Sequence, residues 1–188
     1  NALSKIISIY PNFKLKNYKI PKNKIKFLII PFLIICLRKF FKFKFSNIFF
    51  SNVFNSFAKQ HINSKKENYL IASSGYCLKV LDYAKKKNIK TIVERACPHI
   101  DIQKKIIFNE IEKLPIKNPK EVKLNFFDEK IVDQMLTEYE KCDLISVPST
   151  FTSESFKVYN LEKKLIFNQL TPEKVLQFEK IETSNEKE

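Results

Sequence analysis

Short apolar runs alternate with amphipathic segments over the last two thirds of the chain. Four runs rich in Leu, Ile and Val are bounded by turn residues, as in strands buried on both faces of a sheet: residues 69–73, 91–93, 144–147 and 164–167. Between these runs, apolar residues recur at steps of three and four, which is the spacing of an amphipathic helix. The predicted helices cover residues 76–87, residues 99–113, the stretch from Asp128 to Cys142, and the stretch after Ser149 to about Tyr159.

Residues at the ends of these segments support the helix boundaries. Asp128 precedes the most regular apolar stripe and is predicted to cap that helix, because its side chain can accept a backbone N–H. Asn88 and Asn160 follow two other helices, where the backbone commonly turns left-handed and glycine is the usual residue. Residues 114–127 contain two prolines and several lysines, which predicts a surface loop.

The alternation of strands and helices predicts an α/β fold with a Rossmann-like, doubly wound parallel sheet over residues 67–170. In such sheets, ligands bind outside the carboxyl ends of the strands. The residues that directly follow each strand are therefore the first candidates for a site: 73–76, 94–99, 148–150 and 168–170.

The first 66 residues form a basic, Phe-rich portion of different character. We expect one helix near residues 51–63 and an irregular amphipathic segment before it. The longest apolar run, residues 27–37, has only 11 residues and contains Pro31. Spanning a bilayer takes roughly 20 residues, so no membrane span is predicted. Residues 171–188 are charged and are expected to form a tail or a linker to a further domain.

The net charge of +14 is located entirely in this first portion. Of the 34 Lys and Arg residues, 14 lie in residues 1–66 beside no Asp or Glu, and the other 20 are balanced by the 20 Asp and Glu that follow. Such an asymmetry indicates an anionic partner, which can be nucleic acid, a lipid surface or a phosphorylated substrate. A high content of Lys, Asn, Ile and Phe is also typical of an AT-rich genome, but that bias does not explain the missing acids.

Residues 38–45 alternate cations with Phe. A segment of this kind can lie in an anionic lipid interface, with Phe buried and Lys at the headgroups. It can also stack nucleobases above a phosphate-binding groove. Nucleic acid is the less favoured partner, because the chain has no RNP-like aromatic signature, no G-x-x-G loop and no zinc knuckle. A third interpretation is a solvated element whose Phe side chains face the core.

The richest cluster of reactive side chains follows the strand predicted at 91–93. Glu94, Arg95, Cys97 and His99 fall within six residues. His can orient groups or exchange protons near neutral pH, and Arg can hold phosphate through its planar donor fork. Alternatively, Glu94 and Arg95 form an ion pair and His99 only starts the next helix. A Cys97 nucleophile with His99 as its base is disfavoured, because residues two apart at such a turn rarely align.

Two further candidates lie at other strand ends. Gly75 follows Ser74 in a predicted tight turn that lacks the flanking glycines of a nucleophile elbow and the lysine of a phosphate loop. Ser149 precedes a helix, where its hydroxyl can cap the backbone and the exposed N–H groups can receive an anion. The four cysteines form no C-x-x-C pair, so the sequence predicts reduced thiols, no metal site and no disulfide framework.

In sequence order, these motifs resemble the N-terminal, acceptor-side domain of family-4 type retaining glycosyltransferases of the GT-B fold. The resemblance runs from about Leu70 to Phe167. Two spaced segments carry most of it: E-R-x-x-x-H-x-x-x-Q at residues 94–103 and E-Y-x-x-x-D-x-x-x-V-P-S at residues 138–149. The chain departs from the family where Asn88 and Asn160 replace glycine. The family's first strand with its Gly-rich acceptor loop is also not visible, and we expect it upstream of Asn1.

The resemblance implies transfer of a sugar from a nucleotide-sugar donor, acting as co-substrate, to a glycan or other acceptor, with no further cofactor and no metal. It implies a catalytic role for His99 and substrate-binding roles for Glu94, Arg95, Gly75 and Ser149. The donor-binding half, with its paired glutamates, is expected to follow the last strand, so these 188 residues are expected to be inactive alone. We expect a cytoplasmic protein, peripheral at the inner face of the membrane. The alternative function is a non-enzymatic basic α/β module that binds nucleic acid or an anionic membrane surface.

Overall fold

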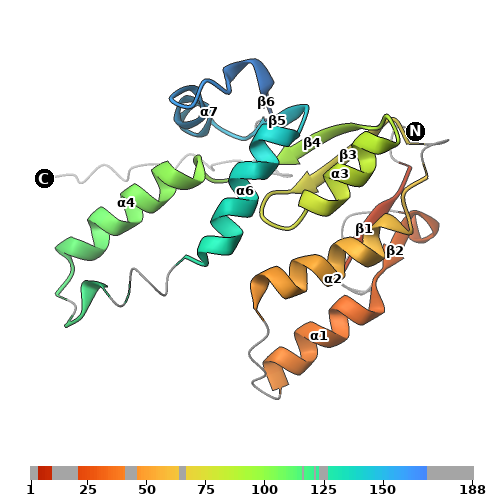
Figure 1. The fold of residues 1–188 in the computed structure, drawn as a ribbon, viewed down its shortest axis with the longest axis horizontal. Helices are drawn as coiled ribbons and strands as arrows, with labels where there is room; N and C mark the ends of the chain where they lie inside the picture. Colours follow the sequence, from red (N-terminus) through yellow and green to blue (C-terminus); the bar gives the residue numbers. More distant parts are fainter. Residues whose placement is uncertain are drawn as a thin grey trace, which may run out of the picture.

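A four-stranded parallel sheet with strand order β3-β4-β5-β6 forms the centre of the molecule (Figure 1). The computed structural model describes residues 4–9, 21–40, 46–63, 67–115, 117–120, 122 and 127–168. The strands are β3 (Tyr69–Ser73), β4 (Lys90–Glu94), β5 (Leu144–Val147) and β6 (Leu165–Phe167). They alternate with α3 (Leu78–Lys86), α4 (Ile100–Lys113), α6 (Glu129–Lys141), α7 (Thr150–Lys157) and the short 3-10 helix η3 (Glu162–Lys164). The predicted α/β class and the parallel pairing are confirmed.

The predicted helix ends are also confirmed. The Asp128 carboxylate accepts from Lys130 N–H at 3.1 Å and caps α6. Asn88 and Asn160 both have φ of 56°, the left-handed conformation expected of residues that terminate helices. Only part of the predicted loop at 114–127 and none of the tail at 171–188 lie within the described residues.

The hydrophobic core lies on one face of this sheet. Alternate strand residues point to that face, and helices α3, α4, α6 and α7 all contribute to the same core. The strand members are Leu70, Ala72, Val93, Ile145, Val147 and Leu165, and the helix members include Leu81, Ile100, Val132, Tyr139 and Phe156. Because each strand is added on the same side of the previous one, right-handed crossovers place the connecting helices on a single face.

The opposite face of the sheet is open at β3 and at the end of β4, whereas Ser146 of β5 on the same face is buried. On β3, Tyr69 is 59% exposed and Ile71 is 65% exposed, and the exposed Glu94 ends β4 on the same face. The sheet formed by the described residues is therefore not doubly wound, contrary to the prediction. A doubly wound sheet needs strands added in both directions from a central strand, and these four strands are added in one direction only.

The first portion is more regular than the sequence predicted. It contains the parallel pair β1 (Ile6–Ser8) and β2 (Ile25–Phe27), the 3-10 helix η2 (Lys22–Lys24), and helices α1 (Ile29–Phe40) and α2 (Asn47–Lys59). For the described residues, the expectation of an irregular segment before residue 51 was wrong, and the helix expected at 51–63 begins and ends four residues earlier. Pro31 is compatible with α1 because it lies in the first turn, where backbone N–H groups have no intrahelical partner.

Helix α2 attaches this portion to the α/β core. Asn55 is buried on α2, its Nδ2 donates to Tyr76 O at 2.7 Å, and its Oδ1 accepts from Val80 N–H at 2.9 Å. Ala58 of α2 packs with Leu28 and Val80 in a second, smaller core cluster. No described helix combines the length and apolar character needed to cross a bilayer.

Candidate functional site

The carboxyl ends of β3, β4 and β5 meet at one edge of the sheet, as the pairing of Ser73 with Glu94 and of Glu94 with Ser146 requires. A small pocket of about 20 Å³ lies at this edge, enough for about one water molecule. It is lined by Glu94, Arg95, Ala96, Ser146, Pro148 and Asn168. The pocket alone is therefore too small for a nucleotide or a sugar, and a site here would also need the surfaces around it.

A buried carboxylate organises the turn after β3. Glu138 of α6 is fully buried, and it accepts from the N–H groups of Gly75, Cys77 and Leu78 at 2.6, 2.9 and 3.0 Å. Gln134, one helical turn earlier, donates from Nε2 to Glu138 at 3.0 Å and to Gly75 O at 2.8 Å. Glu138 thus occupies the start of α3, the position that would otherwise attract an external anion.

Gly75 is buried against α6, and its N–H is already bonded to Glu138. Its φ is +91°, and a Cβ at this position would lie 2.6 Å from Cε of Met135. The structure thus gives Gly75 a close-packing role in the turn.

Gly75→Ala is expected to lower the free energy of unfolding by about 1 to 3 kcal/mol, because alanine rarely adopts this φ and its methyl group displaces Met135. Urea unfolding measures the change. Ser73→Ala, at an exposed position two residues earlier, is the control and should change stability by less than about 0.5 kcal/mol. Equal stability of the two variants would contradict this role of Gly75.

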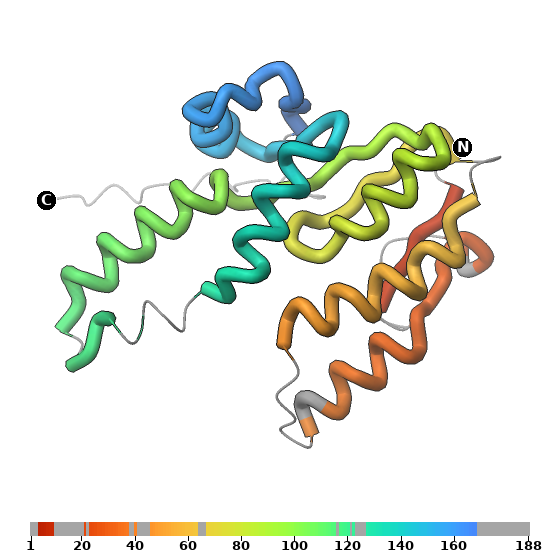
Figure 2. Tube along the Cα trace, viewed as in Figure 1, coloured from red at the N-terminus to blue at the C-terminus, as the bar shows by residue number. Residues whose placement is uncertain are grey.

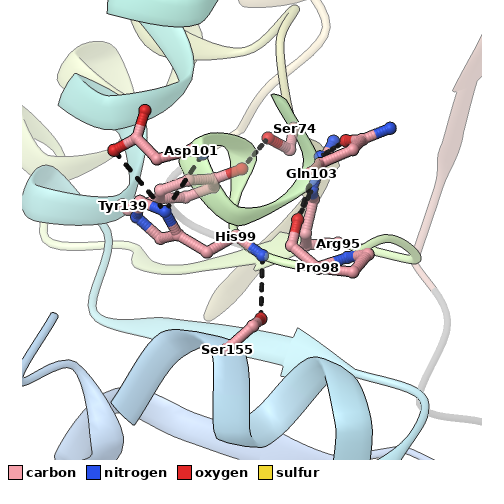
Figure 3. A network of polar contacts seen from close by, with 8 residues as sticks. All are labelled: Ser74, Arg95, Pro98, His99, Asp101, Gln103, Tyr139 and Ser155. Carbon is pink, nitrogen blue, oxygen red and sulfur yellow. Dashed lines mark hydrogen bonds and ion pairs between the residues drawn. The ribbon is translucent and has the colours of Figure 1, made fainter. Parts of the chain in front are cut away.

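Arg95 directly follows β4 and points to the side of α4 and α6, opposite to Glu94, because neighbouring strand residues alternate. Its side chain is 8% exposed. Nε and Nη2 each donate to Pro98 O at 3.1 Å, and Nη2 also donates to Gln103 Oε1 (Figure 3). Nη1 lies 3.9 Å from Sδ of Met135. The ion pair with Glu94 that the sequence left open is absent from the described interactions. All of the guanidinium's described acceptors are uncharged.

His99 caps the N-terminus of α4 and is 2% exposed. Its ring stacks on Tyr159 with centroids 3.7 Å apart and meets Tyr139 and Phe156 at 5.2 and 5.1 Å. Its backbone N–H donates to Ser155 Oγ at 2.8 Å (Figure 3). The prediction that His99 starts a helix is confirmed, and the ring is part of an aromatic cluster.

Burial lowers the pKa of His99 to about 4, with a further contribution from Arg95 against the opposing charge of Asp101. The imidazole is therefore neutral at neutral pH. Nδ1 accepts from Asp101 N–H at 3.4 Å and lies 3.8 Å from the Asp101 carboxylate. The bond from Asp101 N–H favours the tautomer with the ring proton on Nε2. Nε2 is bonded to no described residue, and the residue as a whole is 2% exposed. His99 can thus donate a hydrogen bond from Nε2 but is a poor base.

The remaining candidates from the sequence do not belong to the aromatic cluster around His99. Glu94 is exposed on the open face of the sheet and lines the small pocket. Ser149 accepts from Thr152 N–H at 3.2 Å and caps α7, which is one of the two roles predicted for it. Cys97 is half-buried, and no described interaction joins it to His99. No group of three or more His, Cys, Asp or Glu side chains among the described residues could hold a metal ion.

Sequence reasoning missed the structural importance of Gln134 and Glu138. Both lie beside the apolar stripe of α6 and are spaced four residues apart, so they share a helix face that is otherwise buried. Polar residues on a buried face need hydrogen-bond partners, and this signal could have identified them.

In comparisons with known proteins, no family model, no curated protein and no solved structure matched this chain. The fold and the site define an α/β domain with a parallel sheet, a buried Arg and a neutral His at the strand ends.

Proposed function

We propose that this chain is the acceptor-side half of a retaining glycosyltransferase, and that Arg95 holds phosphate charge of the nucleotide-sugar donor. The observation that carries the proposal is the buried guanidinium of Arg95, whose described partners are Pro98 O, Gln103 Oε1 and the sulfur of Met135. Burying a cation without a nearby negative charge is unfavourable. An anionic ligand that approaches Nη1 would supply that charge.

Phosphate is the anion whose chemistry fits the proposed reaction. In sugar transfer, an acceptor oxygen replaces the donor phosphate on the anomeric carbon, and the phosphate leaves with the bonding electrons and takes up the acceptor's proton. A fixed guanidinium stabilises the charge that develops on the leaving phosphate. His99 complements it, because a neutral imidazole that donates from Nε2 can bind a sugar hydroxyl without adding a second buried charge. The donor is a co-substrate, and the proposal includes no metal and no other cofactor.

The test uses Gln103→Glu, which places a carboxylate of the same shape beside Nη2 of Arg95. This internal counter-charge competes with an external anion, so affinity for a nucleotide sugar is expected to fall at least about tenfold, while the stability of the fold is kept or increased. Isothermal titration calorimetry with UDP-, GDP- and ADP-sugars measures the affinity, on a protein that also contains the expected donor-binding half. Asn109→Asp adds the same charge at an exposed position on α4 and should leave binding unchanged.

Two results would overturn the proposal: no binding of any nucleotide sugar, or equal binding by wild type and Gln103→Glu. Inorganic pyrophosphate that binds as tightly as the nucleotide sugars would reduce the site to a simple anion site. The alternative function, a non-enzymatic basic module, predicts salt-sensitive binding to single-stranded RNA or to anionic vesicles without any affinity for nucleotide sugars.

A further inference from the structure

Helix α1 presents an apolar stripe to solvent. Ile29, Leu33, Leu37 and Phe40 are spaced three or four residues apart and share one face of the helix. Their exposed fractions are 60%, 51%, 39% and 75%, and the neighbouring Ile30 is 47% exposed. An amphipathic helix normally turns such a stripe toward the core. Here the stripe faces outward, so it marks an interaction surface.

The other side of α1 attaches the helix to the protein. Pro31 is buried, and Phe32 is half-buried with its ring 5.3 Å from that of Phe27. Leu28, directly before the helix, belongs to the core cluster that includes Ala58 of α2. Figure 2 shows α1 as the outermost helix, with α2 between it and the α/β core. The exposed stripe is therefore held on the outside of a packed helix pair.

The portion of the chain that contains α1 is basic, although Glu67, directly after it, pairs with Lys5 at 3.8 Å. Residues 1–66 carry 14 Lys and Arg and no Asp or Glu. Lys26 is exposed on β2, just before the helix, and Arg38 and Lys39 lie in its last turn. In the sequence, Lys42 and Lys44 follow directly. An apolar stripe in a segment with this excess of cations matches the surface of an anionic bilayer, which offers hydrocarbon next to negative headgroups.

We infer that α1 lies in the surface of an anionic lipid bilayer, with its stripe at the boundary between headgroups and acyl chains and the surrounding cations on lipid phosphates. The helix has 12 residues and is about 18 Å long, shorter than the roughly 30 Å hydrocarbon core, so it lies in the interface. Four of the five exposed apolar residues of α1 are aliphatic and cannot stack on bases, which disfavours a single-stranded nucleic acid. This inference is independent of the proposed glycosyltransferase activity.

Vesicle co-sedimentation tests the inference. Wild-type protein should bind vesicles of phosphatidylcholine with phosphatidylglycerol, bind pure phosphatidylcholine vesicles more weakly, and lose most of its anionic-vesicle binding at high salt. Leu33→Glu places a charge in the middle of the stripe and should weaken binding at least about tenfold. Because Leu33 is exposed, the fold should be kept, which circular dichroism verifies. The matched control is Val158→Glu, the same kind of change at a 71% exposed residue next to α7.

Lys26→Glu separates the electrostatic contribution to vesicle binding, because it should weaken binding to anionic vesicles but not to pure phosphatidylcholine vesicles. Lys105→Glu on α4 is the control and should not weaken binding to anionic vesicles. Three outcomes would overturn the inference. The first is no binding to anionic vesicles. The second is equal binding by Leu33→Glu and wild type. The third is a wild-type dimer that Leu33→Glu converts to a monomer without any vesicle binding, which would make the stripe a contact between copies of the chain. Leu33→Glu should leave nucleotide-sugar binding unchanged. A protein that fails to bind nucleotide sugars would therefore count against the proposed function and not against this membrane inference.

Discussion

Glu138→Gln is expected to lower the free energy of unfolding by about 2 to 4 kcal/mol. The change keeps the size of the side chain but replaces one carboxylate oxygen with an NH2 group, which cannot accept from the N–H groups of Gly75, Cys77 or Leu78. At least one buried N–H then loses its partner, and the negative charge at the start of α3 disappears. Urea unfolding followed by far-UV circular dichroism measures the effect.

Glu140→Gln is the matched control for this change. Glu140 lies on the same helix, is exposed, and should alter stability by no more than about 0.5 kcal/mol when substituted. Domains of this size are typically stable by about 5 to 15 kcal/mol, so the loss expected for Glu138→Gln is a large fraction of the total. Unfolding midpoints that coincide for the two variants would show that Glu138 does not hold the turn.

Acid is expected to destabilise the protein through His99. The native state keeps this imidazole neutral until about pH 4, whereas in the unfolded chain it takes up a proton near its ordinary pKa of 6.5. As the pH falls between these values, the unfolded state binds more protons and is favoured. The free energy of unfolding that depends on the neutral state of His99 is fully present above pH 6.5 and is lost by pH 4. The loss amounts to roughly 3 kcal/mol in total, of which about 2 kcal/mol falls between pH 7 and pH 5.

His99→Asn is the variant that isolates this effect. Asparagine cannot titrate but is a good N-cap residue, so the cap on Asp101 N–H is kept while the aromatic stacking is lost. Stability at neutral pH should fall, and the slope of stability against pH between 7 and 5 should become flatter than that of wild type. His61→Asn is the comparison, because burial also lowers the pKa of His61 but its side chain is only half-buried. A slope that His99→Asn leaves unchanged would refute the assignment.

The α/β core could be predicted from the sequence because its signals are local. The strands at 69–73 and 144–147 are confirmed at the predicted bounds, and the predicted strand 91–93 gains one residue at each end. Asn88 and Asn160 reported the helix ends correctly, since few other residues tolerate a left-handed backbone. The apolar run at 27–37 was harder, because Pro31 suggests a break wherever its position within a helix turn is unknown.

The geometry of the site could be predicted only in part. The sequence placed Arg95 and His99 together after β4, and both are there. It could not show that Glu138 closes the turn at Gly75, because this contact joins residues 63 positions apart. It also could not show that Arg95 has only neutral partners, because Met135 lies 40 positions away and its contact depends on how α6 packs. Their roles in substrate binding and catalysis, like those of Glu94, Gly75 and Ser149, stay predictions.

The strand order has a consequence for folding. Neighbouring strands are also consecutive in the chain, and paired residues lie 21 positions apart between β3 and β4 (Tyr69 and Lys90) and 20 apart between β5 and β6 (Ile145 and Leu165). Between β4 and β5 the separation is 52 positions (Ile92 and Leu144), because α4 and α6 both lie in the connection. Closing this longer loop costs only about 0.8 kcal/mol more chain entropy than closing either short one. The sheet thus consists of two local β-α-β units that join at a single longer-range seam.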